Sequence, residues 1–259
     1  MSGSAHRGRG GFAALLLIAT AALTVALAVS IGEMRIPLAT VGLSATNHLG
    51  WTDAQISRIQ DSVIWDLRLS RALVAALCGA GLAICGAILQ SLLRNTLAEP
   101  YVLGVSAGAS TGAVAVIILG VGAGTVSLSA GAFAGALAAF AFVALLSDGG
   151  RGGPDRTILA GVAAAQLFNA LTAYVVTTSG NAQQARDVMF WLLGSFGGVR
   201  WPEFQLLAVV MLIGLVVCIW YAHALDAFTF GDDAAASMGI AVGRVRIVLF
   251  ATTALITAT

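Results

Sequence analysis

Long apolar stretches alternate with short polar breaks along almost the whole chain. A membrane-spanning helix needs about 20 mostly apolar residues. About seven stretches approach this length, at 12–31, 69–90, 101–120, 126–146, 157–178, 203–222 and 245–259. The breaks between them hold most of the charged residues, together with glycines and prolines that interrupt helices. This pattern predicts an all-α fold, a polytopic membrane helical bundle.

Two segments near the amino terminus differ from the other apolar stretches. The first apolar stretch could be a signal peptide, with Ala26-Leu27-Ala28 as its cleavage site. Its apolar core is long for a signal, and the segments that follow are also apolar, which favours a membrane anchor. Residues 32–66 are more polar, and we predict that they form a partly helical segment outside the membrane.

Composition supports a membrane protein and argues against other classes. Hydrophobic residues make up 59% of the chain and charged residues 10%, and the mean hydropathy is +0.94. Because soluble domains carry roughly 25% charged residues, this chain has too little charge to cover a surface that faces water. Its net charge of +1 gives no argument for a nucleic-acid partner.

The cationic residues are all arginines, and their distribution sets the expected orientation. Cytoplasmic loops of membrane proteins carry an excess of positive charge. With the amino terminus in the cytoplasm, the inner side holds Arg7, Arg9, Arg94, Arg151, Arg156, Arg244 and Arg246, and the outer side holds Arg35, Arg58, Arg68, Arg71, Arg186 and Arg200. This near-even division favours a cytoplasmic amino terminus only weakly. It also indicates that the outer arginines have another function.

The sequence contains little that could support catalysis or hold a metal ion. Gly104 to Gly108 match G-x-S-x-G, but that nucleophile motif needs a strand, a turn and a helix, whereas here it lies in an apolar run. No group of His, Cys and carboxylate residues has the spacing of a metal site. A Walker A loop needs a lysine, and the chain has none. We therefore predict no catalytic residue, no metal and no cofactor on this chain, and an energy source on a partner.

Glycines recur at helical spacing in two of the apolar stretches. They lie at Gly104, Gly108 and Gly112, and again at Gly131 and Gly135. Residues four apart share one face of a helix, and small residues on that face let neighbouring backbones approach closely. The spacing predicts tight packing between these helices.

Residues 68–109 contain a series of glycine, polar and apolar residues at fixed spacing. They are Arg68, Leu69, Arg71, Gly79, Leu82, Gly86, Gln90, Asn95, Leu97, Ala98, Pro100, Leu103, Gly104, Gly108 and Ala109. The series closely resembles the pattern R-L-P-R, then G-x-x-L-x-x-x-G-x-x-x-Q, then N-P-L-A-x-P-x-x-L-G-x-x-x-G-A, which belongs to the permease subunits of ABC importers for iron chelates, haem and cobalamin. Ser70 and Thr96 replace prolines of the family, so the backbone near them is expected to be less restricted.

Two later segments agree with the resemblance, which covers approximately residues 60–259. Residues 190–201 are similar to the family's W-x-x-G-S/G-x-x-x-x-x-W element, with Trp191 and Trp201 as its tryptophans. Residues 228–239 resemble the family's cytoplasmic L-x-L-G-x-x-x-A-x-x-L-G loop. Within this loop Gly231, Ala235 and Gly239 match, while Phe228, Phe230 and Met238 replace leucines.

The 228–239 region also has the features of a short capped helix. Asp232 is expected to be its N-cap, Ala234–Ser237 the helix, and Gly239 the residue that ends it. A capped helix between two spans suits insertion into a groove on a partner. The resemblance identifies the region as a cytoplasmic coupling helix, and the partner as an ATPase that binds ATP and Mg²⁺. Its expected coupling residues are Phe228, Phe230, Gly231, Asp232, Ala235, Met238 and Gly239.

The resemblance implies that the chain is one half of a transporter. Family permeases have ten spans, so residues 1–259 are expected to form a single, incomplete transmembrane permease domain. They pair with a second permease, either an identical copy or a sister subunit, and receive substrate from an external binding protein. Arg68 and Arg71 would bind acidic residues of that protein. Helix packing and the translocation path would involve Gly79, Gly86, Gln90, Asn95, Pro100, Gly104 and Gly108.

The resemblance also gives a location and a substrate class. The expected location is the bacterial cell membrane (the inner or plasma membrane), where the multi-pass chain contacts lipids. Ferric siderophores are the commonest cargo of the family and are the expected substrate, while haem and cobalamin remain open alternatives. The competing class is a stand-alone secondary carrier or channel, which would need neither a coupling helix nor paired outer arginines.

Overall fold

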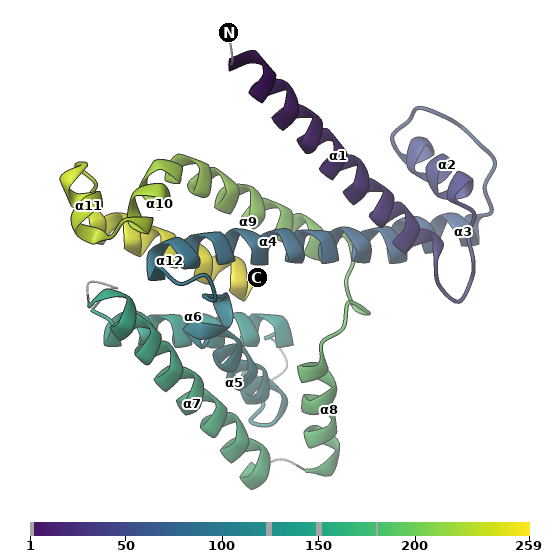
Figure 1. Ribbon diagram of the computed structural model, residues 1–259. Coiled ribbons are helices and arrows are strands. Elements are labelled where there is room, and N and C mark those ends of the chain that lie inside the picture. Colours follow the sequence, from purple (N-terminus) through teal and green to yellow (C-terminus); the bar gives the residue numbers. More distant parts are fainter. Residues whose placement is uncertain (1–2, 123–125, 149–151, 180) are drawn as a thin grey trace. The chain divides into compact units, whose positions relative to one another are not determined.

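The computed structural model describes residues 3–122, 126–148, 152–179 and 181–259 (Figure 1). The described residues form helices joined by turns and contain no strand. The elements, in chain order, are α1 Gly3–Ser30, α2 Leu38–His48, α3 Arg58–Ser62, the π-helix η1 Val63–Leu69, α4 Ser70–Leu93, the 3₁₀ helix η2 Pro100–Leu103, α5 Val105–Ile117, α6 Leu128–Leu146, α7 Gly153–Ser179, α8 Ala182–Leu193, α9 Trp201–Trp220, α10 Ala222–Thr229, α11 Asp232–Ser237 and α12 Val242–Ala258.

The predicted apolar stretches fall on helices, which confirms the all-α helical membrane fold. Four helical stretches of the described chain are long and apolar enough to cross a membrane: Arg58–Leu93, Leu128–Leu146, Gly153–Thr178 and Trp201–Trp220. The first and last predicted stretches lie on α1 and α12. The segment predicted outside the membrane is partly helical, as expected, because it contains α2 and α3.

The predicted span at 101–120 is shorter in the structure. A 3₁₀ turn and a left-handed residue, Gly104, come first, so that α5 begins only at Val105 and has 13 residues. An α-helix of this length extends about 20 Å, whereas the apolar core of a bilayer is about 30 Å thick. Helix α5 alone therefore does not cross a membrane.

One helical run continues from Arg58 to Leu93 and includes a π-helical segment. Such segments are rare and occur frequently at functional sites. The π-helix ends at Leu69, beside Ser70, which stands where the resembled family has a proline. The Ser70 hydroxyl donates to the Asp66 carbonyl at 3.0 Å. A proline at this position would have no backbone N–H to donate, whereas Ser70 has both its backbone N–H and its hydroxyl.

Helices α8 and α10 were not predicted from the apolar pattern. Helix α8 begins with a capping box, in which the Asn181 side chain accepts from the backbone N–H of Gln184 and the Gln184 side chain accepts from that of Asn181. Asparagine followed three residues later by glutamine is a known start signal. The sequence therefore carried a signal for α8 that hydrophobic length alone could not show.

The chain divides into two compact units. Unit 1 contains residues 1–78 and 196–207, and unit 2 contains residues 79–195 and 208–259. In unit 1, Val29, Ile36, Val41 and Ile64 form a small buried core. A row of rings also lies in this unit: His48 stacks on Trp65 at 4.0 Å, and Trp65 contacts Trp201 at 5.0 Å.

Unit 2 contains the larger core and the close helix packing predicted from the glycines. Helix α5 lies beside α6 and α7 (Figure 1). A Cβ atom on Gly112 would overlap the Gly131 carbonyl of α6, and one on Gly135 would overlap the Gly108 carbonyl of α5. On the α7 side, the Thr111 hydroxyl lies 2.8 Å from the Phe168 carbonyl and 2.9 Å from the Thr172 hydroxyl. The predicted tight packing between these glycines is confirmed.

Candidate functional sites

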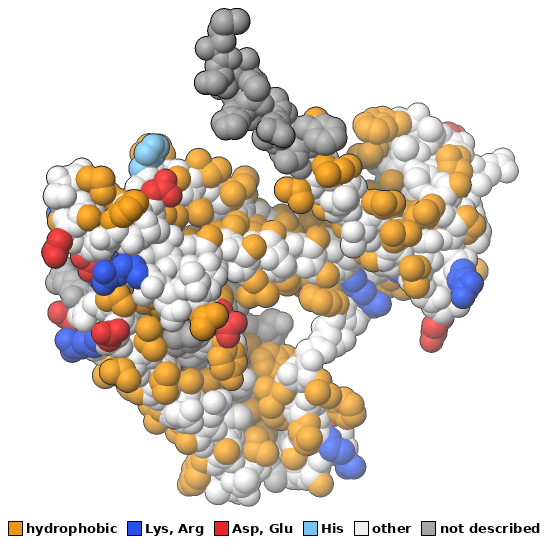
Figure 2. Space-filling model, in the orientation of Figure 1, with side chains coloured by type: hydrophobic (Ala, Val, Ile, Leu, Met, Phe, Trp, Pro, Cys, Tyr) orange, Lys and Arg blue, Asp and Glu red, His pale blue; other side chains and the backbone are white. Residues whose placement is uncertain are grey.

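The end of α10 and the whole of α11 form a compact projection on unit 2. Two of its side chains are buried, Phe228 with 1% and Ala235 with 0% of its surface exposed. Two large apolar side chains point outward, because Phe230 is 79% and Met238 58% exposed. Figure 2 shows charged side chains gathered over this end of the unit. The projection is therefore anchored on one side and presents an apolar contact surface on the other.

The prediction that Asp232 caps α11 is wrong. Gly231 occupies the N-cap position, and Asp232 is the first residue of the helix. The Asp232 carboxylate instead accepts from the Arg246 guanidinium of α12 at 2.5 Å. The Arg246 side chain is only 4% exposed and also lies over the Phe228 ring, 5.7 Å from its centroid. This contact ties the projection to the first turns of α12.

Helix α11 ends at the predicted glycine. Gly239 has φ +80°, and its N–H donates to the Ala236 carbonyl at 2.9 Å, while the Ile240 N–H donates to the Ala235 carbonyl at 3.1 Å. These two bonds make a Schellman motif, which satisfies the last carbonyls of a helix and favours glycine at the left-handed position. The predicted role of Gly239 as the helix stop is confirmed.

The turn after α4 contains the Asn95 and Thr96 of the family-like motif. The Ala98 N–H donates to the Asn95 carbonyl at 3.0 Å, and the Leu97 N–H donates to the Asn95 side chain at 2.9 Å. Thr96 therefore occupies the second position of a β-turn, where proline is common. The Asn95 side chain holds the turn through its own hydrogen bond, so the turn forms without the proline.

This turn contacts the α10–α11 projection through Arg94. A Cβ atom on Gly231 would lie 3.3 Å from Nη1 of Arg94. The guanidinium of the α4–η2 turn thus lies against the backbone at the start of α11. Two of the segments that carry the family-like patterns, 68–109 and 228–239, are brought together here.

Pro100 and Gly104 position the start of α5. Pro100 is the buried first residue of η2, and Gly104 has φ +67°. A Cβ atom on Gly104 would lie 3.0 Å from the backbone nitrogen of Ala165 in α7. Glycine is required at this position both by its left-handed backbone and by the approach of α7.

The remaining predicted packing residues lie in two kinds of environment. Gly108 is buried against α6, with Ala139 beside it. Gly79 and Gln90 are exposed, and nothing lies within 4 Å of a Cβ placed on Gly79. Gly86 is half-buried and faces the Gln90 side chain of its own helix. In α4 the close contact is made by Gly81 instead, where a Cβ would lie 2.9 Å from Sδ of Met211.

Arg68 closes the end of α1 in unit 1. Its Nη1 donates to the Val29 carbonyl at 2.9 Å, and its Nη2 donates to the Met34 carbonyl at 2.7 Å. The last carbonyls of a helix have no partners within the helix and carry partial negative charge. The guanidinium satisfies this end and connects the η1 segment to α1.

Arg71 binds a different carbonyl of unit 1. Its Nη2 donates to the Gly197 carbonyl at 2.6 Å. The same oxygen accepts from Nη1 of Arg200 at 3.3 Å. Residues three apart share one face of a helix, but the guanidinium groups of Arg68 and Arg71 have separate partners, and that of Arg71 lies next to Arg200.

The larger of two cavities described in unit 2 lies beside the family-like start of α5. Its volume is about 470 Å³. It is lined by residues of α5, of α8 with its C-terminal end, and of α12, among them Ser106, Ser110, Trp191, Ser195 and Thr257. The predicted glycines of α5 face other helices, whereas its serines face this cavity. The sequence pattern identified the helix but not the side that lines open space.

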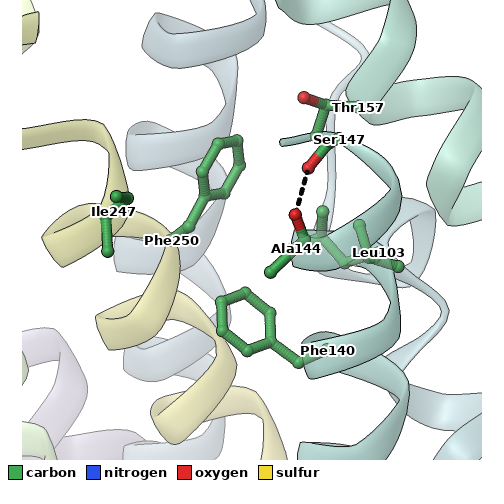
Figure 3. A pocket seen from close by; sticks show the side chains of 8 residues that line it. Leu103, Phe140, Ala144, Ser147, Thr157, Ile247 and Phe250 are labelled. Carbon is green, nitrogen blue, oxygen red and sulfur yellow. Dashed lines mark hydrogen bonds between the residues drawn. The ribbon is translucent and has the colours of Figure 1, made fainter. Parts of the chain in front are cut away.

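A second, smaller cavity is almost entirely apolar (Figure 3). Its volume is about 130 Å³, and Phe140 and Phe250 lie on two of its sides. The two hydroxyls in its wall bind backbone oxygens: Ser147 donates to the Ala144 carbonyl at 3.4 Å and Thr157 to the Gly153 carbonyl at 3.0 Å. This cavity therefore offers no free polar group in its described wall for a polar ligand.

Comparison with known proteins agrees with these features. The sequence pattern that defines the FecCD transport family matches residues 16–259. The cobalamin import system permease protein BtuC of Halobacterium salinarum is 34% identical over 236 residues, which is 91% of this chain and 62% of that protein. The iron(3+)-hydroxamate import system permease protein FhuB of Bacillus subtilis is 31% identical over 224 residues, 86% of this chain and 56% of that protein. The chain thus spans about three fifths of the length of these relatives.

A solved structure supports the fold independently. It is described as a metal-chelate type ABC transporter in an inward-facing conformation, with a TM-score of 0.78 and 24% identity. The match covers 94% of this chain and 73% of that one. At this identity, the likeness bears on the arrangement of the helices alone.

Proposed function

Since the chain belongs to the FecCD transport family, we propose that it is the membrane permease subunit of an ATP-driven importer for ferric siderophores. It works by alternating access, together with a separate ATPase, a second permease and an external substrate-binding protein. It lies in the cell membrane of a bacterium, with its amino terminus in the cytoplasm. The family match and the permease names of the relatives support this proposal.

The α10–α11 projection is the observation that carries the proposal. Phe230 and Met238 are exposed on either side of the short helix α11, a shape that suits a groove on a partner protein. The ion pair between Asp232 and Arg246 connects this helix to α12. A movement of the ATPase would therefore reach α12 directly. The chain itself has no lysine with which to build a Walker A loop.

The outer arginines supply the second contact of the importer. Arg68 and Arg71 place two positive charges near the external end of the Arg58–Leu93 run. Guanidinium groups bind carboxylates with strong, directional hydrogen bonds. In this proposal they attract acidic residues of the binding protein, Arg71 by direct contact and Arg68 through its charge.

In this proposal the larger cavity forms part of the substrate path. Its wall combines small hydroxyl side chains with apolar and aromatic ones, among them Phe190 and Trp191. A path that must release its cargo benefits from weak contacts, and these side chains provide no charge that would hold a ferric chelate. The second permease would complete the wall.

Cobalamin is the alternative substrate, because one relative at 34% identity is named as a cobalamin permease. Haem stays open as a third cargo of the resembled family. These alternatives change the substrate and leave the mechanism as proposed. A stand-alone carrier is the competing class, and it differs from the proposed importer because it needs no contact with an ATPase.

Co-purification with the cognate ATPase tests the proposed coupling surface, which consists of the exposed Phe230 and Met238 side chains. We expect Phe230→Asp and Met238→Asp each to lower recovery of the permease–ATPase complex by about tenfold, because central apolar contacts dominate interface energy. Phe230→Leu, which keeps an apolar side chain, is the matched control and should retain the complex. Full recovery with both aspartate variants would remove this surface from the ATPase contact.

A further inference from the structure

Helix α2 of unit 1 presents an outward face that carries no charge. Its inward side holds the buried Val41 and Ser44, and His48 lies on this side too, since its ring stacks on Trp65. The helix contains no Asp, Glu, Lys or Arg. Its outward residues are exposed and uncharged: Leu38, Ala39, Gly42 and Leu43. A helix face that meets water usually carries charged and polar residues, so this face is poorly suited to water.

The exposed apolar surface continues into the turn that follows α2. Leu49 is 57% and Trp51 75% exposed. The Trp51 N–H donates to the Thr46 carbonyl at 2.9 Å, which holds this turn against the end of the helix. Tryptophan is enriched where a protein meets the boundary between membrane and water, because its ring is apolar and its N–H can reach polar groups. The position of Trp51 therefore favours a membrane surface beside α2.

An exposed apolar row on α1 leads to the same surface. Leu23, Leu27 and Ile31 are exposed at intervals of four residues, so they lie along one side of that helix. The Ser30 hydroxyl donates to the Ile36 carbonyl at 2.6 Å, and the Ile36 N–H donates to the Ser30 carbonyl at 3.1 Å. These bonds turn the chain directly from α1 to α2, and the two helices are in contact (Figure 1). Because α1 is a predicted span, α2 is held at the depth where that span ends.

The charged residues around α2 lie outside it along the chain. Glu33 and Arg35 precede the helix, Asp53 and Arg58 follow Trp51, and all four are exposed. Charged side chains are costly in the apolar layer of a membrane. The distribution thus leaves α2 and Trp51 as the part of this external segment that can meet acyl chains, with charges on both sides of it.

We propose that α2 and Trp51 lie in the headgroup layer of the membrane, with the uncharged face and the indole ring directed toward the acyl chains. The partner of this face is the lipid surface, as for other helices that lie in the plane of the interface. In the orientation proposed above, this is the outer leaflet. His48 stacks on Trp65 and lies 3.1 Å from the Asp61 carboxylate. Through these contacts the lipid-bound helix fixes the depth of α3 and η1.

Spin-label accessibility in lipid nanodiscs tests this location. One nitroxide is attached to Leu43→Cys or to Trp51→Cys in the full permease, after the native cysteines at 78, 85 and 218 are replaced by alanine. Oxygen dissolves preferentially in acyl chains, whereas a polar nickel chelate stays in water. We expect collisions with oxygen to exceed those with the chelate at both positions. Arg35→Cys and Asp53→Cys are the matched controls at exposed charged positions, where the chelate should collide more often.

The other outcomes overturn the inference, and each identifies a different occupant. More frequent collisions with the chelate at positions 43 and 51 would place the face in water. Low rates with both reagents would mean that a second permease covers it. A loss of chelate collisions only after the binding protein is added would assign the face to that protein. The ATP-driven uptake of the proposed importer is unaffected by any of these results.

A second measurement covers the case in which the cysteine-free permease does not assemble. Brominated lipids quench the fluorescence of tryptophans that touch acyl chains. In nanodiscs of such lipids, we expect the unaltered permease to lose more emission than Trp51→Phe, because Trp51 contributes to the quenched signal. An equal loss of emission from the two proteins would contradict the lipid contact.

Discussion

At the scale of single residues, the contact between Arg246 and Asp232 has the largest consequence. An arginine that is almost wholly buried needs a charged or polar partner, because an unpaired buried charge is costly. Asp232 provides that partner from the first turn of α11, and the Phe228 ring covers the guanidinium. This pair of side chains therefore holds α11 against α12.

Replacing Asp232 with alanine tests this dependence. Asp232→Ala removes the carboxylate that accepts from the Arg246 guanidinium, and we expect a loss of stability on the order of 1–3 kcal/mol. The thermal unfolding midpoint of the purified chain should fall. The matched control is Asp233→Ala, which removes the exposed neighbouring carboxylate and should change stability by less than about 0.5 kcal/mol. Equal midpoints for the two variants would contradict the role of the pair.

The roles of some residues could be predicted from the sequence, and those of others could not. Gly239 was predictable because its function is local: it ends a helix in a left-handed conformation. The role of Asp232 was not predictable from local rules, since its partner lies 14 residues away and on another helix. The sequence did indicate that Arg246 needs a partner. A charge within a predicted apolar span calls for a partner, but the sequence alone does not identify which carboxylate provides it.

At the scale of elements, the length of each apolar stretch predicted where a helix lies along the chain. It did not predict the residues at which the helices begin and end. Burial of apolar side chains fixes where helices form, so the long stretches were found. The start of α5 depends on the left-handed Gly104 and on the approach of α7, and the start of α8 depends on the capping box at Asn181. These are backbone and capping effects that a count of apolar residues does not contain.

The glycine contact between α5 and α6 can be tested directly. Gly112→Leu would place a side chain against the Gly131 backbone, and we expect a cost of about 1–3 kcal/mol from overpacking. Gly79→Ala is the control, because it lies on an exposed helical surface with open space. Alanine there should be neutral or stabilise the helix by about 0.5–1 kcal/mol. Thermal unfolding in detergent compares the two, and a stable Gly112→Leu variant would argue against close α5–α6 packing.

At the scale of the whole molecule, the two proposed contacts lie in different units of the chain. The arginines of the docking site belong to unit 1, and the α10–α11 projection and the larger cavity belong to unit 2. Helices α4 and α9 contribute residues to both units. The chain also passes between the units from Ser195 to Phe196. In the proposed importer these three connections are the covalent links through which docking outside and ATP use inside affect one another.

Substrate accumulation in reconstituted vesicles tests the central claim most directly. The full permease is reconstituted with its ATPase, its cognate binding protein is added outside, and uptake of a radiolabelled ferric hydroxamate, haem or cobalamin is followed. We predict accumulation of one of these substrates only when the ATPase and ATP are both present, and its loss with Phe230→Asp. Accumulation at the same rate by the permease alone, without ATPase or ATP, would contradict the account.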